Sequence, residues 1–97
     1  MSGNRLQYSE CLRIYEVEET FIASLQEVGL IRVVDQDDDR FIAYDDLSDL
    51  EQFIRWYYEM DINVGGIDAL HHMLQRVRSL QSEIAQLRHE LQFYRSL

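Results

Sequence analysis

Apolar residues recur every three or four positions in two short segments near the start of the chain, a pattern typical of amphipathic helices. Ser9 is a suitable N-cap for the first helix, and the second runs from Glu18 to Val28. The apolar positions are Cys11, Leu12 and Tyr15 in the first segment and Phe21, Ile22, Leu25 and Val28 in the second. Gly29 follows where a left-handed residue commonly ends a helix. Two short helices joined around residues 16–17 predict a helix-turn-helix.

The pattern then changes to β-branched and aromatic residues in Ile31–Val34 and again in Arg40–Tyr44. The polar residues 35–39 separate the two runs and are typical of a turn. We therefore expect a β-hairpin, which after a helix-turn-helix would be a wing. Two strands alone are marginally stable in water, so the hairpin must pack on the helices.

A third helix is expected to open at Asp45 and Asp46, because carboxylates stabilise the positive end of the helix dipole. Its apolar stripe consists of Leu47, Leu50, Phe53, Ile54, Tyr57 and Tyr58. Trp56 lies outside this stripe, roughly 180° around the helix from Leu47 and among acidic residues. Two interpretations stay open: Trp56 belongs to a binding surface, or it packs beneath the final helix.

Asn63 is a good N-cap for a long final helix. Eight apolar residues alternate three and four positions apart along this helix: Leu70, Met73, Val77, Leu80, Ile84, Leu87, Leu91 and Tyr94. The repeat covers about four heptads, more than the rest of the chain needs to cover its own core, so we expect a homodimer through this coiled-coil stripe. Parallel pairing, antiparallel pairing and packing on the partner's core stay open. The chain thus divides into residues 1–62, the winged helix-turn-helix region with its third helix, and residues 63–97, the dimerisation helix.

Length and composition exclude several kinds of protein and of functional site. The chain has 97 residues, of which 46% are hydrophobic, and this supports one modest core with little room for a deep catalytic cavity. It contains no proline. Its one cysteine, Cys11, excludes a disulfide framework within the chain and a cysteine-based zinc site. No apolar run approaches the ~20 residues of a membrane span, and no signal-peptide pattern opens the sequence. We expect a cytoplasmic location and no membrane association.

The charge is strongly acidic and unevenly distributed. The chain carries 18 acidic residues against nine arginines, for a net charge of −9. Residues 1–65 hold 15 acids and five arginines, whereas residues 66–97 hold three acids and four arginines. A strongly acidic surface repels the phosphates of nucleic acids and attracts basic patches of other proteins, although net charge also keeps small proteins soluble.

The sequence offers no convincing catalytic or metal-binding set. His71 and His72 are adjacent, so their rings project about 100° apart instead of sharing one helix face as paired metal ligands do. The acids of residues 35–39 lack the central glycine and the final glutamate of a calcium loop. Gly65 and Gly66 precede no Lys-Ser or Lys-Thr pair, so they form no phosphate-binding loop. We expect no enzyme activity, no metal and no cofactor.

The order of elements resembles the MerR type of winged-helix regulator. The resemblance lies in four segments: Phe21–Ile31, Phe41–Tyr44, Asp46–Leu50 and the Ile62-Asn63 pair that leads to Ile67. The DNA-reading side chains of that family are replaced, however. Its wing carries an arginine where this chain has Ile42, and its second helix carries an arginine where this chain has none. Those arginines normally contact phosphates.

The chain is similar along nearly its whole length to a branch of this fold, the chaperone-modulatory CbpM family. The similar segments are Tyr15–Ile22, Glu27–Ile31, Leu50–Arg55, the Ile62-Asn63 pair and Leu91–Tyr94. The resemblance implies binding to the J domain of a DnaJ-like co-chaperone of the CbpA type, and inhibition by covering the J-domain face that engages the Hsp70 partner DnaK. A MerR-type DNA-binding transcriptional regulator is the alternative, and a structural dimer that scaffolds another partner is a third hypothesis.

An acidic surface of this kind would attract the basic helix that a J domain presents to its Hsp70. The residues expected to form it are Glu16, Glu18, Glu19, Asp35, Asp37, Asp38, Asp39, Asp49, Trp56 and Glu59. Trp56 is the expected apolar anchor, because exposed ion pairs contribute more to association rate and specificity than to affinity.

Overall fold

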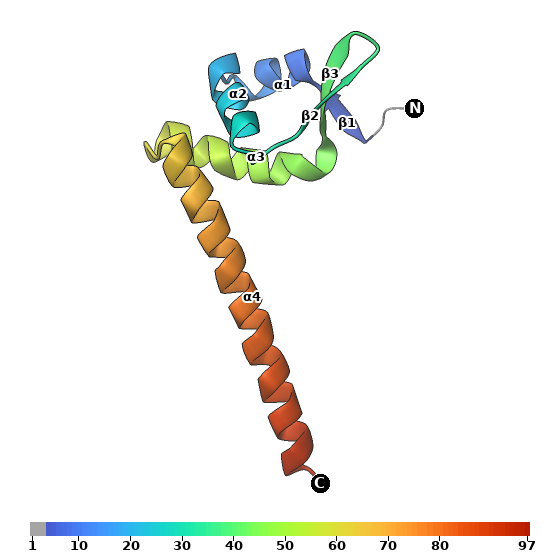
Figure 1. Ribbon diagram of the computed structural model, residues 1–97, viewed down its shortest axis with the longest axis vertical. Coiled ribbons are helices and arrows are strands. Elements are labelled where there is room, and N and C mark those ends of the chain that lie inside the picture. Colours follow the sequence, from blue (N-terminus) through green and yellow to red (C-terminus); the bar gives the residue numbers. More distant parts are fainter. Residues whose placement is uncertain (1–3) are drawn as a thin grey trace.

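The computed structural model describes residues 4–97 and shows a mainly α-helical winged helix-turn-helix with a long C-terminal helix (Figure 1). This confirms the fold class that the sequence predicts. The elements follow in the order β1 (Arg5–Gln7), α1 (Tyr8–Tyr15), α2 (Glu19–Glu27), β2 (Val33–Gln36), β3 (Asp39–Ala43), η1 (Tyr44–Asp46), α3 (Leu47–Ile54), η2 (Arg55–Glu59) and α4 (Val64–Arg95). The segments η1 and η2 are a 3₁₀ turn and a π-helical turn that extend α3 at its two ends.

The helix-turn-helix is formed by α1 and α2, and both helices end in a residue with left-handed backbone. Glu16 follows α1 with φ 54°, and Gly29 follows α2 with φ 83°. The amide of Leu30 then donates to the carbonyl of Leu25 at 2.9 Å, and the amide of Gly29 donates to that of Gln26. These two bonds satisfy carbonyl groups that a helix end otherwise leaves unpaired. Gly29 therefore has the helix-ending role that its position predicts.

The wing is a β-hairpin, as predicted, but it belongs to an antiparallel sheet of three strands in the order β1-β3-β2. The strand β1 was not predicted; Leu6 pairs with Ile42 of β3. The loop is also shorter than expected, because the strands continue to Gln36 and resume at Asp39. Two residues between them have positive φ, as the tight turns of hairpins require.

The core lies between the helix-turn-helix, one face of the sheet, α3 and the start of α4. It consists of Tyr8, Cys11, Val17, Phe21, Ile22, Leu25, Ile31, Ile42, Leu50, Phe53, Trp56 and Ile67. Ile42 is the only core residue supplied by β3, and its complete burial anchors the wing to the helices. The expectation that the hairpin packs on the helices is thereby confirmed.

Trp56 is 7% exposed, so the interpretation that it forms part of a binding surface is wrong. Its ring lies 6.1 Å from that of Phe53, and the segment η2 that carries it packs against α4. The reason is the path of the chain after α3. The backbone turns at Asp61, which has φ 55°, and the start of α4 then packs against η2, with the ring of His71 5.2 Å from that of Phe53. Burial beside the final helix, the alternative interpretation, is therefore the correct one.

Tyr57 and Tyr58 are more exposed than the sequence predicts. They were assigned to the buried stripe of the third helix, yet they are 36% and 42% exposed. A helical wheel assumes 100° per residue, whereas residues 55–59 form a π-helical turn, in which successive side chains are rotated by a smaller angle. The wheel therefore predicts the buried side correctly for Leu50 and Phe53 but not for the two tyrosines.

The final helix, α4, begins as predicted. The side-chain Oδ1 of Asn63 accepts a hydrogen bond from the amide of Gly66 at 2.7 Å. Ile67 is fully buried, and Leu70 and Leu74 pack against the core, which accounts for Leu70 of the heptad stripe. Beyond residue 74 every side chain of the helix is exposed. The start of α4 therefore belongs to the same core as the preceding elements. The division of the chain into residues 1–62 and 63–97 stays a prediction.

The rest of α4 projects from the folded head (Figure 1). The molecule measures 62 × 37 × 20 Å and has a radius of gyration of 18.2 Å. A compact domain of this length would have a radius of gyration of about 13 Å. The remaining residues of the predicted stripe, from Met73 to Tyr94, are between 41% and 69% exposed. No helix among residues 4–97 has the length and apolarity needed to cross a membrane.

Candidate protein-interaction surface

The exposed face of α2 carries no basic residue. Its sequence is Glu-Thr-Phe-Ile-Ala-Ser-Leu-Gln-Glu, and its exposed positions are Glu19, Thr20, Ala23, Gln26 and Glu27. In a DNA-binding helix-turn-helix, the second helix enters the major groove and needs cations for the flanking phosphates. This face of α2 is therefore acidic where such a protein would be basic.

Arg40 of the wing is committed to contacts within the molecule. Its Nη2 lies 3.6 Å from Oε1 of Glu19, and its guanidinium carbon lies 4.0 Å from the centroid of the Tyr8 ring. Burial raises the pKa of Tyr8, and the Arg40 charge opposes that increase. Arg40 thus connects β3 to the start of α2 and to α1, so its charge is largely offset before any partner arrives.

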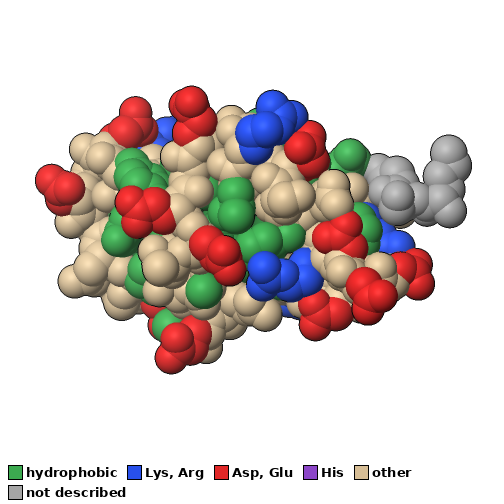
Figure 2. Space-filling view, turned by 90° about the horizontal axis from the view of Figure 1, so that it is seen from above, with side chains coloured by type: hydrophobic (Ala, Val, Ile, Leu, Met, Phe, Trp, Pro, Cys, Tyr) green, Lys and Arg blue, Asp and Glu red, His purple; other side chains and the backbone are tan. Residues whose placement is uncertain are grey.

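The other arginines of the head also face internal partners. Arg13 bonds Glu10 at 2.7 Å and thereby lowers the pKa of that carboxyl, and Arg32 lies 3.9 Å from Asp46. Arg5 lies over the ring of Phe41. In the view from above, carboxylates (red) are spread over the whole face, and arginines (blue) show at only a few places among them (Figure 2). The described part of the head therefore has no continuous arginine ridge along α2 and the wing.

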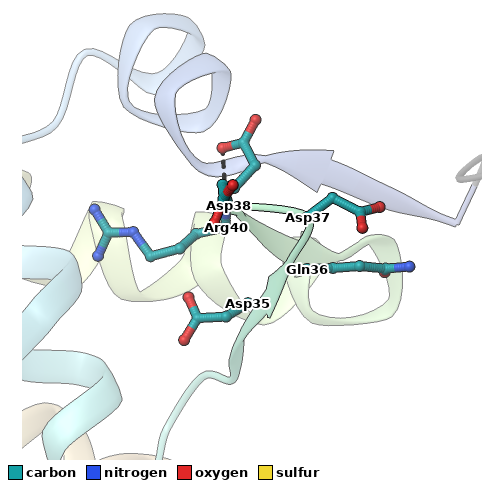
Figure 3. A pocket seen from close by; sticks show the side chains of 6 residues that line it. Asp35, Gln36, Asp37, Asp38 and Arg40 are labelled. Carbon is teal, nitrogen blue, oxygen red and sulfur yellow. Dashed lines mark hydrogen bonds between the residues drawn. The ribbon is translucent and has the colours of Figure 1, made fainter.

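The tip of the wing is an open acidic hollow (Figure 3). The side chains of Asp35 and Arg40 extend to one side of the hairpin, and those of Gln36 and Asp37 extend to the other (Figure 3). Asp39 has a structural role, because its Oδ1 accepts from the amide of Arg40 at 2.8 Å and its Oδ2 accepts from the Gln7 amide group. The acids that remain exposed at the tip are Asp35, Asp37 and Asp38.

The remaining acids of the predicted surface lie on elements other than the wing. Glu16 ends α1, and Glu18 precedes α2. Asp49 is half-buried on α3, whereas Glu59 ends η2 and lies 3.8 Å from Arg55. The start of α2 and η2 are neighbours, since the amide of Glu18 donates to the hydroxyl of Tyr58 at 3.2 Å.

The carboxylate of Glu51 also has a structural role, because it accepts a hydrogen bond from Tyr15. The Tyr15 hydroxyl donates to Oε2 of Glu51 at 2.7 Å, which ties α1 to α3. Burial, together with this hydrogen bond, raises the pKa of Tyr15 to about 12. The hydroxyl therefore keeps its proton, and the tie between the two helices, at any physiological pH.

A second hollow, missed by the sequence analysis, lies where η2 turns into α4. We call it the tyrosine hollow; it is lined by Tyr57, Tyr58, Asp61, Ile62 and Asn63. The two tyrosine rings lie 5.0 Å apart in an edge-to-face arrangement, and both contact the buried ring of Phe21. One signal could have revealed it: three consecutive aromatic residues, 56–58, span more than half a helical turn and cannot all face one core.

The described residues offer little to a metal ion. No group of three or more His, Cys, Asp or Glu side chains within residues 4–97 is arranged to hold one. Cys11 is fully buried, and burial raises the pKa of its thiol to about 11, so it is protonated at neutral pH. The exposed acidic and aromatic groups described above are what the head presents to a partner.

Comparison with known proteins gives one match. The family model described as MerR HTH family regulatory protein matches residues 6–89. No match was found among curated proteins or among solved structures. The matched segment runs from β1 through the helix-turn-helix, the wing and α3 into the projecting part of α4. The chain therefore belongs to the MerR helix-turn-helix family of regulatory proteins.

Proposed function

We propose that this MerR-family protein is a non-enzymatic, cytoplasmic modulator that binds the J domain of a DnaJ-like co-chaperone of the CbpA type. Binding would inhibit the co-chaperone by covering the J-domain face that engages its Hsp70 partner. The observation that carries this proposal is the polarity of the helix-turn-helix. The exposed face of α2 bears Glu19 and Glu27 and no cation, and Arg40 of the wing is engaged with Glu19.

Electrostatics gives the physical basis for that choice of partner. Residues 1–65 hold 15 acids against five arginines, so the head carries a strong negative field. Such a field raises the rate of encounter with a basic helix and lowers it with nucleic acid. The resemblance of Tyr15–Ile22, Glu27–Ile31 and Leu50–Arg55 to the CbpM family supports a J domain as the source of that helix.

The proposal includes a homodimer. The apolar stripe of α4 is exposed from Met73 to Tyr94, and the stability of helices in proteins comes mostly from packing of such an apolar face. A second copy of the chain offers the same stripe, and Glu83, Glu90, Arg88 and Arg95 flank it at the positions where charges pair in coiled coils.

The proposal is tested by calorimetric titration of the full chain with the purified J domain, at low salt and at about 0.3 M salt. We expect binding that weakens as salt rises, because screening shortens the reach of the acidic field. The J-stimulated ATPase of the Hsp70 partner should fall as the chain is added. A chain that leaves both the J domain and the ATPase unaffected overturns the proposal.

The DNA-binding alternative is tested by fluorescence anisotropy with genomic fragments at low salt. Tight, sequence-selective binding would favour a transcriptional regulator. Weak binding that is equal for all sequences and disappears at moderate salt would be ordinary background.

A further inference from the structure

We infer that the tyrosine hollow receives a cationic side chain, arginine above all, from the basic helix of the partner protein. The inference rests on the proposed function, since it names the place on this chain where that partner would be held. Neither the aromatic floor of the hollow nor the exposure of its tyrosines was expected from the sequence.

The hollow has the chemistry that recognises a guanidinium group. Tyr57 and Tyr58 are partly exposed, and the acidic residue Asp61 lines the same hollow. A guanidinium stacks on tyrosine faces and pairs with carboxylates, so both of its modes of contact are available in one place. No basic residue lines the hollow.

The hollow is held in shape before any ligand binds. The Tyr57 ring lies 4.3 Å from that of Phe21, and the Tyr58 hydroxyl accepts a hydrogen bond from the amide of Glu18 at 3.2 Å. On the other side, the amide of Ile62 donates to the carbonyl of Trp56 at 2.9 Å. Preorganised groups lose little entropy on binding, so more of the contact energy is retained as affinity.

The wing tip is the competing location, and its chemistry is weaker. Its exposed groups are the carboxylates of Asp35, Asp37 and Asp38, with no aromatic ring among the lining residues. Exposed ion pairs contribute little to affinity, whereas binding hot spots are rich in tyrosine, tryptophan and arginine. Met60, which is 58% exposed, adds apolar surface at the turn that bears the tyrosine hollow. The aromatic site is therefore favoured as the anchor, and the wing acids as steering charges.

The test compares matched variants of the full chain in calorimetric titrations with the purified J domain. Asp61→Asn removes the carboxylate but keeps a residue that tolerates the left-handed backbone, and we expect binding about threefold weaker. Tyr57→Leu removes the aromatic face, and we expect binding about fivefold weaker. Tyr57→Phe keeps the face and should bind as the unaltered chain does. Asp45→Asn removes an exposed carboxylate elsewhere and serves as the charge control.

The outcomes separate this inference from the proposed function. If the unaltered chain binds the J domain but Asp61→Asn and Tyr57→Leu bind equally well, the inference is overturned and the function stands. Weakening by Asp37→Asn with Asp38→Asn, and not by the tyrosine-hollow variants, would place the anchor on the wing with the same consequence. If the unaltered chain does not bind, both fall. Thermal melts check folding, and if Tyr57→Leu is unfolded, the comparison of Asp61→Asn with Asp45→Asn decides the matter.

Discussion

Trp56 is the single tryptophan of the chain, and it lies in the core beside Phe53, where the segment η2 turns toward α4. On the helical wheel it lies opposite Leu47 and so looks like a surface residue. In the fold, however, it is buried where η2 packs against α4. A residue so placed contributes to stability through its packing, and its substitution should be felt by the whole domain.

Replacing this residue gives a direct measurement. Trp56→Phe should lower the free energy of unfolding by about 1–2 kcal/mol, because a smaller ring leaves part of the buried space unfilled. Urea unfolding followed by circular dichroism measures the change. Tyr44→Phe, at a residue that is 49% exposed, is the matched control and should change stability by less than about 0.5 kcal/mol. Equal effects of the two substitutions would contradict the burial of Trp56.

Cys11 gives the chain a pH dependence of a defined sign. Burial raises the pKa of its thiol to about 11, whereas a thiol in an unfolded chain ionises near about 8.5. Above the lower value the unfolded state loses a proton that the folded state keeps. Stability from this group is therefore complete below about pH 8.5 and is lost as the pH rises toward about 11.

The Cys11→Ala variant removes the thiol together with its influence on the pKa values of Tyr8 and Tyr15, while the other titrating groups are common to both proteins. The unaltered chain should be the more stable at about pH 8, because alanine leaves a small cavity. The difference in the free energy of unfolding should shrink as the pH rises through the interval between the two thiol pKa values. Urea unfolding at several pH values measures it, and a constant difference would mean that the thiol ionises equally in both states.

At the scale of elements, α1 ends at a residue whose backbone conformation lowers the stability of the fold. Glu16 adopts φ 54°, a conformation that glycine accepts freely and that disfavours residues with a Cβ atom. The amide of Val17 still donates to the carbonyl of Leu12 at 3.3 Å, so the turn between α1 and α2 is closed by the same kind of bond as at Gly29.

Glu16→Gly should therefore stabilise the protein by about 0.5–1 kcal/mol, since relief of the left-handed strain outweighs the greater freedom of glycine in the unfolded state. Chemical unfolding measures this gain. Glu16→Ala removes the same charge but keeps the Cβ atom, so it should give no such gain. If both variants were stabilised equally, the cause would be loss of charge and not relief of the backbone.

The elements that the sequence predicts correctly are those with a local signal. Helical spacing marks α1, α2 and α4, Gly29 and Asn63 mark two of their ends, and β-branched residues mark the wing. The strand β1 has three residues, too few for any alternation to show, and it exists because β3 offers a free edge. The wing strands were predicted with the correct lengths but displaced along the chain: β2 lies two residues later than predicted and β3 one residue earlier. Asp35 and Gln36 are polar residues on exposed strand positions, so the sequence assigned them to a turn.

The candidate surface was predictable in its sign but not in its arrangement. Counting acids and arginines predicts an acidic head. Which carboxylates face an arginine of another element, as Glu19 and Asp46 do, depends on tertiary contacts that leave no mark on the local sequence. The exposure of Tyr57 depends likewise on the direction in which α4 leaves the turn at Asp61.

At the scale of the whole molecule, the projecting part of α4 is the feature that a lone copy of the chain does not explain. An isolated helix in water gains little from its backbone hydrogen bonds, and its stability in proteins comes mostly from packing of an apolar face. The stripe includes Ile84, 49% exposed, and Leu87, 62% exposed. Its flanking polar positions, such as Ser82 and Gln86, give a matched surface on the same turns of the helix.

We expect the unaltered chain to sediment at twice its 11.6 kDa mass, and Ile84→Asp with Leu87→Asp to sediment as a monomer with reduced helicity. Two carboxylates buried between apolar stripes would have to be desolvated without partners, which costs several kcal/mol and removes the pairing. Ser82→Asp with Gln86→Asp adds the same charge off the stripe and should leave the dimer intact. Because no residue of α4 beyond Leu74 packs on the core, the monomeric variant should keep the folded spectrum of the head. If the unaltered chain is a monomer at high concentration, the homodimer is contradicted and the stripe is instead a binding face for a different protein.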